Sequence, residues 1–348
     1  MLAALQRDSG EKRRSKMNKS KVLTIALIVV LAGLAVCAWS MFGTTAAGLE
    51  YANADKYTVG DATVTSAVEN LDVDWTAGKV NIEYHNGEGV LVSEKANQTL
   101  NEDDKLRWWL DGTTLHIRYA KSGFRISFNL DKELTVSLPA GTVLKTADIS
   151  STSGDLNLPG LAADEIRLGS TSGSISAVTV TNKLTATSTS GSIAVRQGDT
   201  IGAVDLGSTS GSISCTLGAN AASVTAGSTS GSISLSVAGS VETVKLGSTS
   251  GRIYPELASV GTVEIATTSG GVEGSFSAFK DVDIGTTSGK VTLKLGTDPG
   301  FTCKIGSVSG DFTTGLSLTK NGDTYTCGDG SGRIRIGTTS GDITLEKE

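Results

Sequence analysis

Few side chains in this sequence have the types and spacing that catalysis needs. Only two histidines occur, His85 and His116, and neither has a cysteine or histidine nearby at the spacing of a zinc ligand set. Serine is so abundant that no single serine indicates a nucleophile, and the G-x-S-x-G motif is absent. We therefore predict no catalytic residue, no bound metal and no cofactor.

Acidic residues are scattered along the chain instead of being grouped, as at Asp155, Asp205, Glu242, Glu264 and Asp283. They could line one face of the protein, but their spacing does not give the neighbouring pair of carboxylates that a glycosidase uses. An enzyme acting on cell-wall or capsular polysaccharide is therefore the alternative interpretation, and a non-enzymatic role is the favoured one.

The four cysteines have different expected roles. Cys37 lies in an apolar segment, and Cys215 occupies an inward position that suits a small buried residue. Cys303 and Cys327 flank the last regular repeat and a hairpin. Outside the cell these two could form a disulfide that ties the hairpin to the repeats.

Positive charge is concentrated at the start of the chain. Residues 1–21 carry seven basic and two acidic residues, whereas the whole chain has a net charge of −6, so the remainder has a net charge of −11. Nucleic-acid binding needs clustered Lys and Arg to neutralise phosphates, so we expect no nucleic-acid partner for this acidic body.

Residues 22–42, VLTIALIVVLAGLAVCAWSMF, carry no charge and can cross a membrane core of about 30 Å as a helix. The positive-inside rule then predicts a basic cytoplasmic tail (1–21), a transmembrane signal anchor (22–42), a linker (43–54) and an extracellular C-terminal body. Two other interpretations stay open. One is a cleaved signal peptide with an A-x-A site at 52–54, and the other is a lipoprotein with LAVC at 34–37 as its lipobox.

The body of the chain repeats one short motif, LGSTSGSI, at 168–175 and again at 206–213. On both sides of each Ser-Gly pair the apolar residues alternate with period two, which is typical of β-strands. The glycines of successive repeats are 18 to 21 residues apart, apart from a longer last interval, and they are Gly154, Gly173, Gly191, Gly211, Gly231, Gly251, Gly270, Gly289, Gly310 and Gly341.

The spacing of Leu206 and Ile213 indicates a corner inside the motif. They are an odd number of residues apart, so one continuous strand would place them on opposite faces. Both can point inward only if the chain turns at STSG, and glycine tolerates the positive φ that such a corner often needs.

Corners of this kind predict an all-β fold, a single-chain parallel β-helix or β-solenoid of about 10 rungs. Paired strands lie about 4.8 Å apart, so the rungs would form a rod roughly 50 Å long. Small apolar side chains would fill its interior, and serine and threonine hydroxyls would stack outside.

The ends of a solenoid need covering, and we expect a β cap with the first turns over 55–150, ahead of the repeats over 151–348. The cap contains a predicted hairpin with Trp108 and Trp109, which we expect to pack within the cap or, alternatively, to offer an aromatic ligand platform. A second hairpin is predicted near 315–330.

Two further segments resemble rungs. LDVDWTAGKVNIEY, residues 71–84, has Gly78 at the corner position, and IRIGTTSGDITL, residues 334–345, forms the final rung after the second hairpin.

A membrane segment, LDVDWTAGKVNI, LTVSLPAG at 134–141, repeated TSG-x-[IV] and a closing TTSGDI together resemble the bacterial DUF4097 family of putative adhesins. The resemblance covers about 55–348. It implies a right-handed β-helix, a cell-surface role and a link to the envelope-stress response, and it supplies no catalytic motif.

We therefore predict a membrane-anchored extracellular β-solenoid that binds a cell-surface or envelope partner, protein or glycan, or scaffolds the envelope. A face of stacked hydroxyls that binds ice or another regular lattice is a further hypothesis. The sequence names no ligand.

Overall fold

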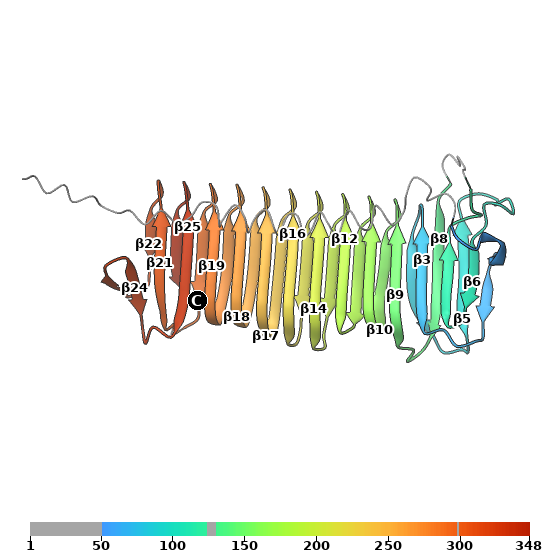
Figure 1. Ribbon diagram of the computed structural model, residues 1–348, viewed down its shortest axis with the longest axis horizontal. Helices are drawn as coiled ribbons and strands as arrows, with labels where there is room; N and C mark the ends of the chain where they lie inside the picture. Colours follow the sequence, from blue (N-terminus) through green and yellow to red (C-terminus); the bar gives the residue numbers. More distant parts are fainter. Residues whose placement is uncertain (1–50, 124–129, 298) are drawn as a thin grey trace, which may run out of the picture.

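The computed structural model describes residues 51–123, 130–297 and 299–348, and these form strands that stack into a long rod (Figure 1). The predicted all-β class is confirmed for this part of the chain. The segments 1–21 and 22–42, predicted as tail and membrane anchor, lie outside it. No helix within the described part is long and apolar enough to cross a membrane.

The strands of the N-terminal cap follow a single 3-10 turn, η1 (Ala54–Lys56), and are β1 (Thr58–Val59), β2 (Ala62–Val64), β3 (Asn70–Trp75), β4 (Val80–His85), β5 (Val90–Ala96), β6 (Arg107–Asp111), β7 (Thr114–Arg118) and β8 (Lys132–Pro139). The stack continues through β9 (Leu144–Ser151), β10 (Leu156–Ser170), β11 (Ile175–Val180), β12 (Lys183–Ser188), β13 (Ile193–Gln197), β14 (Ile201–Ser208), β15 (Ile213–Leu217), β16 (Ala221–Ser228), β17 (Ile233–Ser248), β18 (Ile253–Thr267), β19 (Val272–Thr286) and β20 (Val291–Leu295). The C-terminal strands are β21 (Phe301–Ser307), β22 (Phe312–Thr314), β23 (Thr319–Asn321), β24 (Thr324–Cys327), β25 (Gly332–Thr338) and β26 (Ile343–Lys347).

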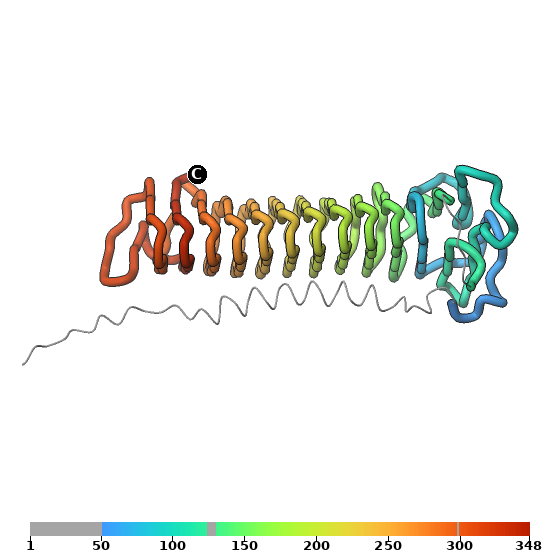
Figure 2. Tube along the Cα trace, turned by 90° about the horizontal axis from the view of Figure 1, so that it is seen from above, coloured from blue at the N-terminus to red at the C-terminus, as the bar shows by residue number. Residues whose placement is uncertain are grey.

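Successive rungs pair in parallel and in register. Ile193 lies opposite Ile213, which lies opposite Ile233, and all three are buried. Viewed from the side and from above, the rod has two layers of strands joined at the corners (Figures 1 and 2). Burying one such side chain contributes about 1.5–3 kcal/mol, so the core grows by a few side chains with each added rung.

The corner glycines are required by close stacking between rungs. A Cβ on Gly211 would lie 2.0 Å from the carbonyl oxygen of Gly191 in the neighbouring rung. None of the ten corner glycines predicted from the sequence has positive φ, so the predicted reason for glycine is wrong. The first hydroxyl of the motif closes the corner, as where the Gly231 amide donates to Ser228 Oγ at 2.9 Å.

At the C-terminal end the rungs do not follow chain order. β25 lies between β19 and β21, and β26 lies between β20 and β22. The rung predicted to be final is therefore next to last, and the expected stacking in chain order is wrong here. Along the chain, the outermost rung (β21 and β22) comes first, and the predicted hairpin follows as β23 and β24. The last two strands, β25 and β26, then lie between the outermost rung and the rung of β19 and β20.

The N-terminal end has the same kind of reversal. The rung of β3 and β4, with its corner at Gly78, lies between the cap strands β7 and β8 and the rung of β9 and β10. Gly78, which the sequence also placed at a corner position, makes eleven corners with the other ten and is the one corner among them with positive φ, 92°. The corners follow the spatial order Gly78, Gly154, Gly173, Gly191, Gly211, Gly231, Gly251, Gly270, Gly289, Gly341 and Gly310.

A buried ion pair holds the cap together. Lys132 is buried, its Nζ lies 2.7 Å from Glu94 Oε2, and it sits 4.1 Å from the ring centroid of Tyr119. The indole of Trp75 donates to the Lys132 carbonyl at 3.0 Å and closes the first rung. Four segments of the cap are joined through this one side chain and its neighbours.

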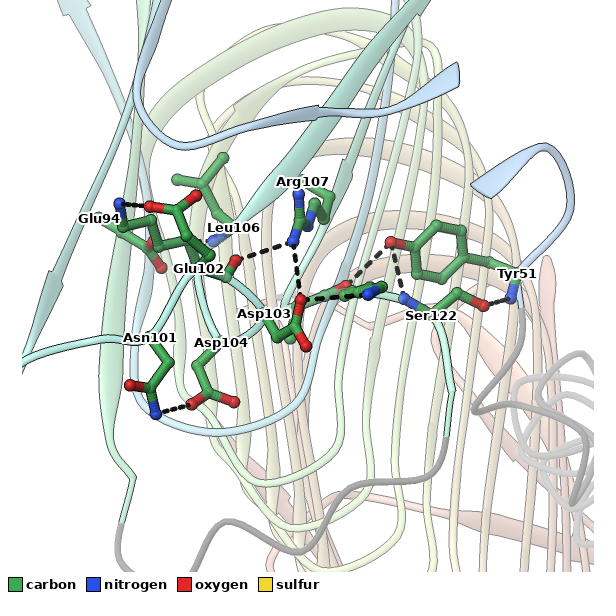
Figure 3. A network of polar contacts seen from close by, with 12 residues as sticks. Tyr51, Glu94, Asn101, Glu102, Asp103, Asp104, Leu106, Arg107 and Ser122 are labelled. Atoms are coloured by element: carbon green, nitrogen blue, oxygen red, sulfur yellow. Dashed lines mark hydrogen bonds and ion pairs between the residues drawn. The ribbon is translucent and has the colours of Figure 1, made fainter. Parts of the chain in front are cut away.

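A second polar network ties the start of the described chain to the cap (Figure 3). The Tyr51 hydroxyl donates to the Ala120 carbonyl at 3.0 Å, and the backbone amide of Tyr51 donates to Ser122 Oγ at 3.1 Å. Arg107 donates to the Glu102 carbonyl at 2.8 Å. Tyr51, at the end of the predicted linker, is thus part of the folded cap.

The predicted disulfide is not formed. Cys303 and Cys327 lie on the paired antiparallel strands β21 and β24, but Cys303 faces Tyr325 and Cys327 faces Phe301. Within the described residues no disulfide joins them. Diagonal neighbours on such strands are about 7–8 Å apart, beyond the usual Cα separation of a disulfide, which reaches about 6.8 Å.

Candidate functional site

The two strand layers expose different chemistry. We call the outward side of the strands that precede the corners the charged face, and the outward side of the strands that follow them the hydroxyl face. Arg167, Lys245 and Glu264 lie on the charged face, whereas Ser176, Ser214 and Ser234 occupy equivalent places on the hydroxyl face.

One column of mostly polar residues runs along the hydroxyl face. Ladder partners connect it from the cap to the far end, through Ser93, Thr135, Asn81, Asn157, Ser176, Ala194, Ser214, Ser234, Tyr254, Glu273, Thr292, Thr344 and Thr313. Each step is one strand spacing of about 4.8 Å. Apart from Ala194, the rod therefore presents hydrogen-bonding side chains at a regular interval along one line, which we call the polar track.

On the charged face, ion pairs link neighbouring rungs. Lys183 Nζ lies 2.8 Å from Glu165, and Lys245 Nζ lies 3.5 Å from Glu264. Of the five acids singled out in the sequence, Asp205, Glu264 and Asp283 fall in one column, mixed with basic residues. Glu264 and Asp283 are direct neighbours in this column, contrary to the expectation that no two of these acids are paired, and each has a basic residue on its other side, Lys245 and Arg335. Asp205 lies between two threonines.

The other two acids lie elsewhere. Asp155 follows a corner on the hydroxyl side and accepts a hydrogen bond from the Ser174 amide at 2.8 Å. Glu242 is exposed and lies three residues before the charged column at Lys245. No group of three His, Cys, Asp or Glu side chains able to hold a metal ion occurs among the described residues.

A polar groove of about 660 Å³ lies at the cap end of the hydroxyl face. It is formed by β2, β5, β8 and β4, whose strands pair in that order. Nine of its twelve lining residues are polar, and the lining is Asp61, Ala62, Thr63, Asn81, Glu83, Leu91, Val92, Ser93, Lys95, Glu133, Thr135 and Ser137. Ser93, Thr135 and Asn81 belong also to the polar track, so the groove opens directly onto it.

Side chains on the groove floor are oriented by one another. Asn81 donates to Glu133 Oε1 at 2.7 Å and accepts from Asn157 Nδ2 at 3.2 Å, while Ser137 donates to Glu83 Oε1 at 2.9 Å. Each carboxylate keeps further lone pairs for a ligand, because an ionised carboxylate has about four acceptor sites. The groove is thus a set of fixed acceptors with amide and hydroxyl groups beside them.

Glu83 and Glu133, two of the three carboxylates of the groove, do not have the spacing of a glycosidase pair. Thr135 lies opposite Asn81, which places Glu133 and Glu83 four residues apart along the strands. Four residues correspond to about 13 Å of strand, whereas glycosidases hold their carboxyl groups about 5–9.5 Å apart. The geometry suits hydrogen bonding to a ligand better than acid–base cleavage of it.

Trp108 and Trp109 are adjacent in β6, and Trp108 packs against the hydrophobic core. His116 stacks on Trp109 at a centroid distance of 5.3 Å, and Lys56 Nζ lies 4.8 Å from the same ring. Tyr57 also contacts it, at 5.7 Å. Trp109 is half-buried and its ring contacts three neighbouring side chains, which supports the cap-packing interpretation over an open ligand platform.

His116 also belongs to a charged cluster that the sequence did not reveal. Its Nδ1 lies 2.6 Å from Asp72 Oδ2, and Arg118 donates to both oxygens of that carboxylate at 2.6 and 3.1 Å. Burial favours a higher pKa for Asp72, but the hydrogen bonds and charges of Arg118 and His116 outweigh it and hold the pKa below its usual value. Burial raises the pKa of the neighbouring Asp74.

The groove could not be found from the sequence because its floor combines strands far apart in the chain. Ser93 meets Thr135 only through the antiparallel pairing of β5 with β8. Neither strand carries the repeat motif, and their polar residues alternate with apolar ones as in any half-buried strand.

Comparison with known proteins finds a family model and several solved structures. The Toastrack DUF4097 family model matches residues 68–346, which confirms the resemblance noted in the sequence. No curated protein matches the chain. A putative cell adhesion protein from Clostridium sporogenes is similar at 12% identity and a TM-score of 0.20, over 84% of this chain and all of that one. A putative adhesin from Bacteroides fragilis is similar at 13% identity and a TM-score of 0.30, over 84% of this chain and 97% of that one.

Proposed function

This chain belongs to the Toastrack DUF4097 family, and from that premise we propose that it is a membrane-anchored surface protein with an adhesin-like binding role. Its polar groove and polar track would bind a linear, polyhydroxylated polymer, a glycan of the cell envelope or of a neighbouring surface. The observation that carries this proposal is that the groove opens onto a line of regularly spaced side chains, most of them polar.

The chemistry of the lining selects the class of ligand. Carboxylate, amide and hydroxyl groups are acceptors and donors that match the hydroxyls of a sugar, whereas the three apolar lining residues offer little to a lipid. A long polymer can contact several rungs at once. Many weak contacts then add up, so a track without a deep pocket is sufficient for useful binding.

The proposed anchor would place the groove close to the membrane. Tyr51 is hydrogen bonded to the cap, and only residues 43–50 separate it from the predicted span at 22–42. Eight extended residues reach at most about 29 Å. The groove would therefore lie near the membrane surface. The C-terminal end of the rod would lie farthest from the membrane.

Binding can be tested with the full chain in detergent and chitohexaose, cellohexaose and sheared peptidoglycan as probes in titration calorimetry. We expect at least one probe to bind, and the double variant Asn81→Ala, Glu83→Gln to weaken it about tenfold, because two ligand hydrogen bonds are lost. The control is Glu264→Gln on the charged face, which should bind like the wild type.

Two results would overturn the proposal. One is the absence of binding to every probe by a correctly folded wild-type chain. The other is an equal loss of affinity in the groove variant and in Glu264→Gln, which would show that overall charge and not the groove holds the polymer.

A further inference from the structure

The C-terminal end of the rod is covered over only part of its outermost rung. β24 pairs antiparallel with β21 at residues 301–303, whereas no strand among the described residues pairs with the outer side of 304–307 or of β22. We call residues 304–314 the distal tip. Strand edges of this kind can pair with a strand from another chain.

Core positions are exposed at the distal tip. Ile305 stands in the column of Leu206 and Ile284, and Phe312 in the column of Ile213, where the inner rungs bury their side chains. Ile305 and Phe312 themselves are only half-buried, because no further rung stacks on them, although the ring of Tyr325 from the hairpin packs against Phe312 at a centroid distance of 5.2 Å. The tip therefore ends in a section of the hydrophobic core that the hairpin covers only in part.

Val308 marks this corner as different from the others. It is 74% exposed, the most exposed of the large apolar side chains in the described part of the chain. The same position is threonine at every other regular corner, namely Thr152, Thr171, Thr189, Thr209, Thr229, Thr249, Thr268, Thr287 and Thr339. Valine has the shape of threonine without the hydroxyl, so the outermost corner has lost a group that would hydrogen bond to water.

We propose that the distal tip binds the distal tip of a second copy of this chain, joining two rods end to end. The contact does not depend on what the polar groove binds. In the arrangement of the proposed function, with the opposite end at the membrane, it would connect proteins anchored in two facing membranes.

The shape of the tip is complementary to itself about a two-fold axis. β21 enters the corner and β22 leaves it, so the two strands run in opposite directions across the rung. An axis parallel to these strands places β21 of one copy beside β22 of the other in an antiparallel pair, and brings the two Val308 corners together.

The exposed charges of the tip fit the same arrangement. Lys304 lies on the outward side of β21, and the exposed Asp311 directly precedes β22. The two-fold axis places Lys304 of each copy beside β22 of the other copy, close to Asp311. The opposite charges of Lys304 and Asp311 then favour the contact. β24 pairs with β21 only at residues 301–303, so it leaves the edge of residues 304–307 open for the partner.

The test uses the full chain in detergent with Cys37→Ser as the parent. Val308→Cys should give a disulfide-linked dimer on oxidation, and Val143→Cys should not, because Val143 is 65% exposed but lies between β8 and β9, away from the tip. Negative-stain microscopy of the linked dimer should show rods about twice the length of the monomer.

The isosteric change Val308→Thr restores the residue of the other corners and should weaken self-association at least fivefold in sedimentation velocity, with Val143→Thr as its control. Equal cross-linking at positions 308 and 143, linked dimers that lie side by side, or association unchanged by Val308→Thr would each overturn the proposal.

Discussion

Arg335 donates through Nε to Asp283 at 3.0 Å, although 52 residues separate them in the chain. Arg333 pairs with Asp281 in the same two rungs. In plain chain order, Asp283 would still face a basic residue, Lys304, but Asp281 would face Thr302 of the outermost rung, which cannot form an ion pair. The charges therefore favour the order in which the final rung is inserted between two earlier ones.

Reversing one of these charges should weaken the C-terminal end. Arg335→Asp places a third negative charge beside Asp281 and Asp283, and we expect a loss of about 1 kcal/mol in the free energy of unfolding, since both partners are partly exposed. The double variant with Asp283→Arg should recover most of it. A double-mutant cycle by urea unfolding that gives no coupling would contradict this role.

A methyl group at a corner glycine should be far more costly than the same change elsewhere. Gly211→Ala puts a Cβ 2.0 Å from a backbone carbonyl, so neighbouring rungs must separate, at a cost of about 3 kcal/mol or more. Gly198→Ala is the matched control, because nothing lies within 4 Å of its added Cβ. Thermal unfolding of both variants checks this, and equal melting temperatures would refute the stacking explanation.

The buried Lys132 should matter mainly through the charge it neutralises. Lys132→Met leaves the Glu94 carboxylate, with a side chain only 6% exposed, without its ion pair, which should cost about 3–5 kcal/mol. Adding Glu94→Gln removes the charge and keeps an oxygen for the Leu106 amide, 2.7 Å away. We expect the double variant to unfold at a higher urea concentration than Lys132→Met alone, and the reverse order would contradict this account.

Replacing Asp72 and replacing Asp74 with asparagine should change the melting temperature at pH 7 in opposite directions. The raised pKa of Asp74 means that the folded protein holds a proton that the unfolded chain has lost above pH 3.8, so its contribution to stability falls as pH rises through that window. Asp74→Asn should therefore raise the melting temperature at pH 7 by about 2–4 °C and have little effect near pH 3.

Asp72 has a lowered pKa, so its stabilising contribution is complete at neutral pH and is lost as the pH falls through the lowered value. Asp72→Asn should lower the melting temperature at pH 7 and matter less in acid. Melting curves over a pH series measure both variants, and the same sign for both at pH 7 would show that the cluster is organised differently.

The rungs of the rod were predictable because the same spacing of apolar residues around a Ser-Gly pair recurs many times in the sequence. Leu206 and Ile213 can both be buried only if the chain turns between them, and the same pattern recurs at every corner. The reason for glycine was not predictable from one repeat. It depends on the carbonyl of the neighbouring rung, which is a contact between repeats.

The order of the strands at the two ends and the lining of the groove could not be predicted from the sequence, for a related reason. Strand pairing is decided by which free edge a segment meets, and the two end segments fold back to edges left by earlier strands. Ser93 and Thr135 in the groove are brought together by such a return. Local alternation gives the faces of each strand but not its neighbours.

The order of the rungs fixes the groove, the track and the tip, and spin-label distances between positions of the polar track test it directly. Ladder partners put Thr344 five strand spacings from Ser214 and Thr313 six, or about 24 and 29 Å. Buried Cys215 and Cys303, whose pKa burial raises to about 12, should resist labelling, and Cys37→Ser and Cys327→Ala remove the other thiols. We predict that the pair 214–344 gives the shorter distance in double electron–electron resonance. A shorter distance for 214–313 would restore chain order and contradict the account.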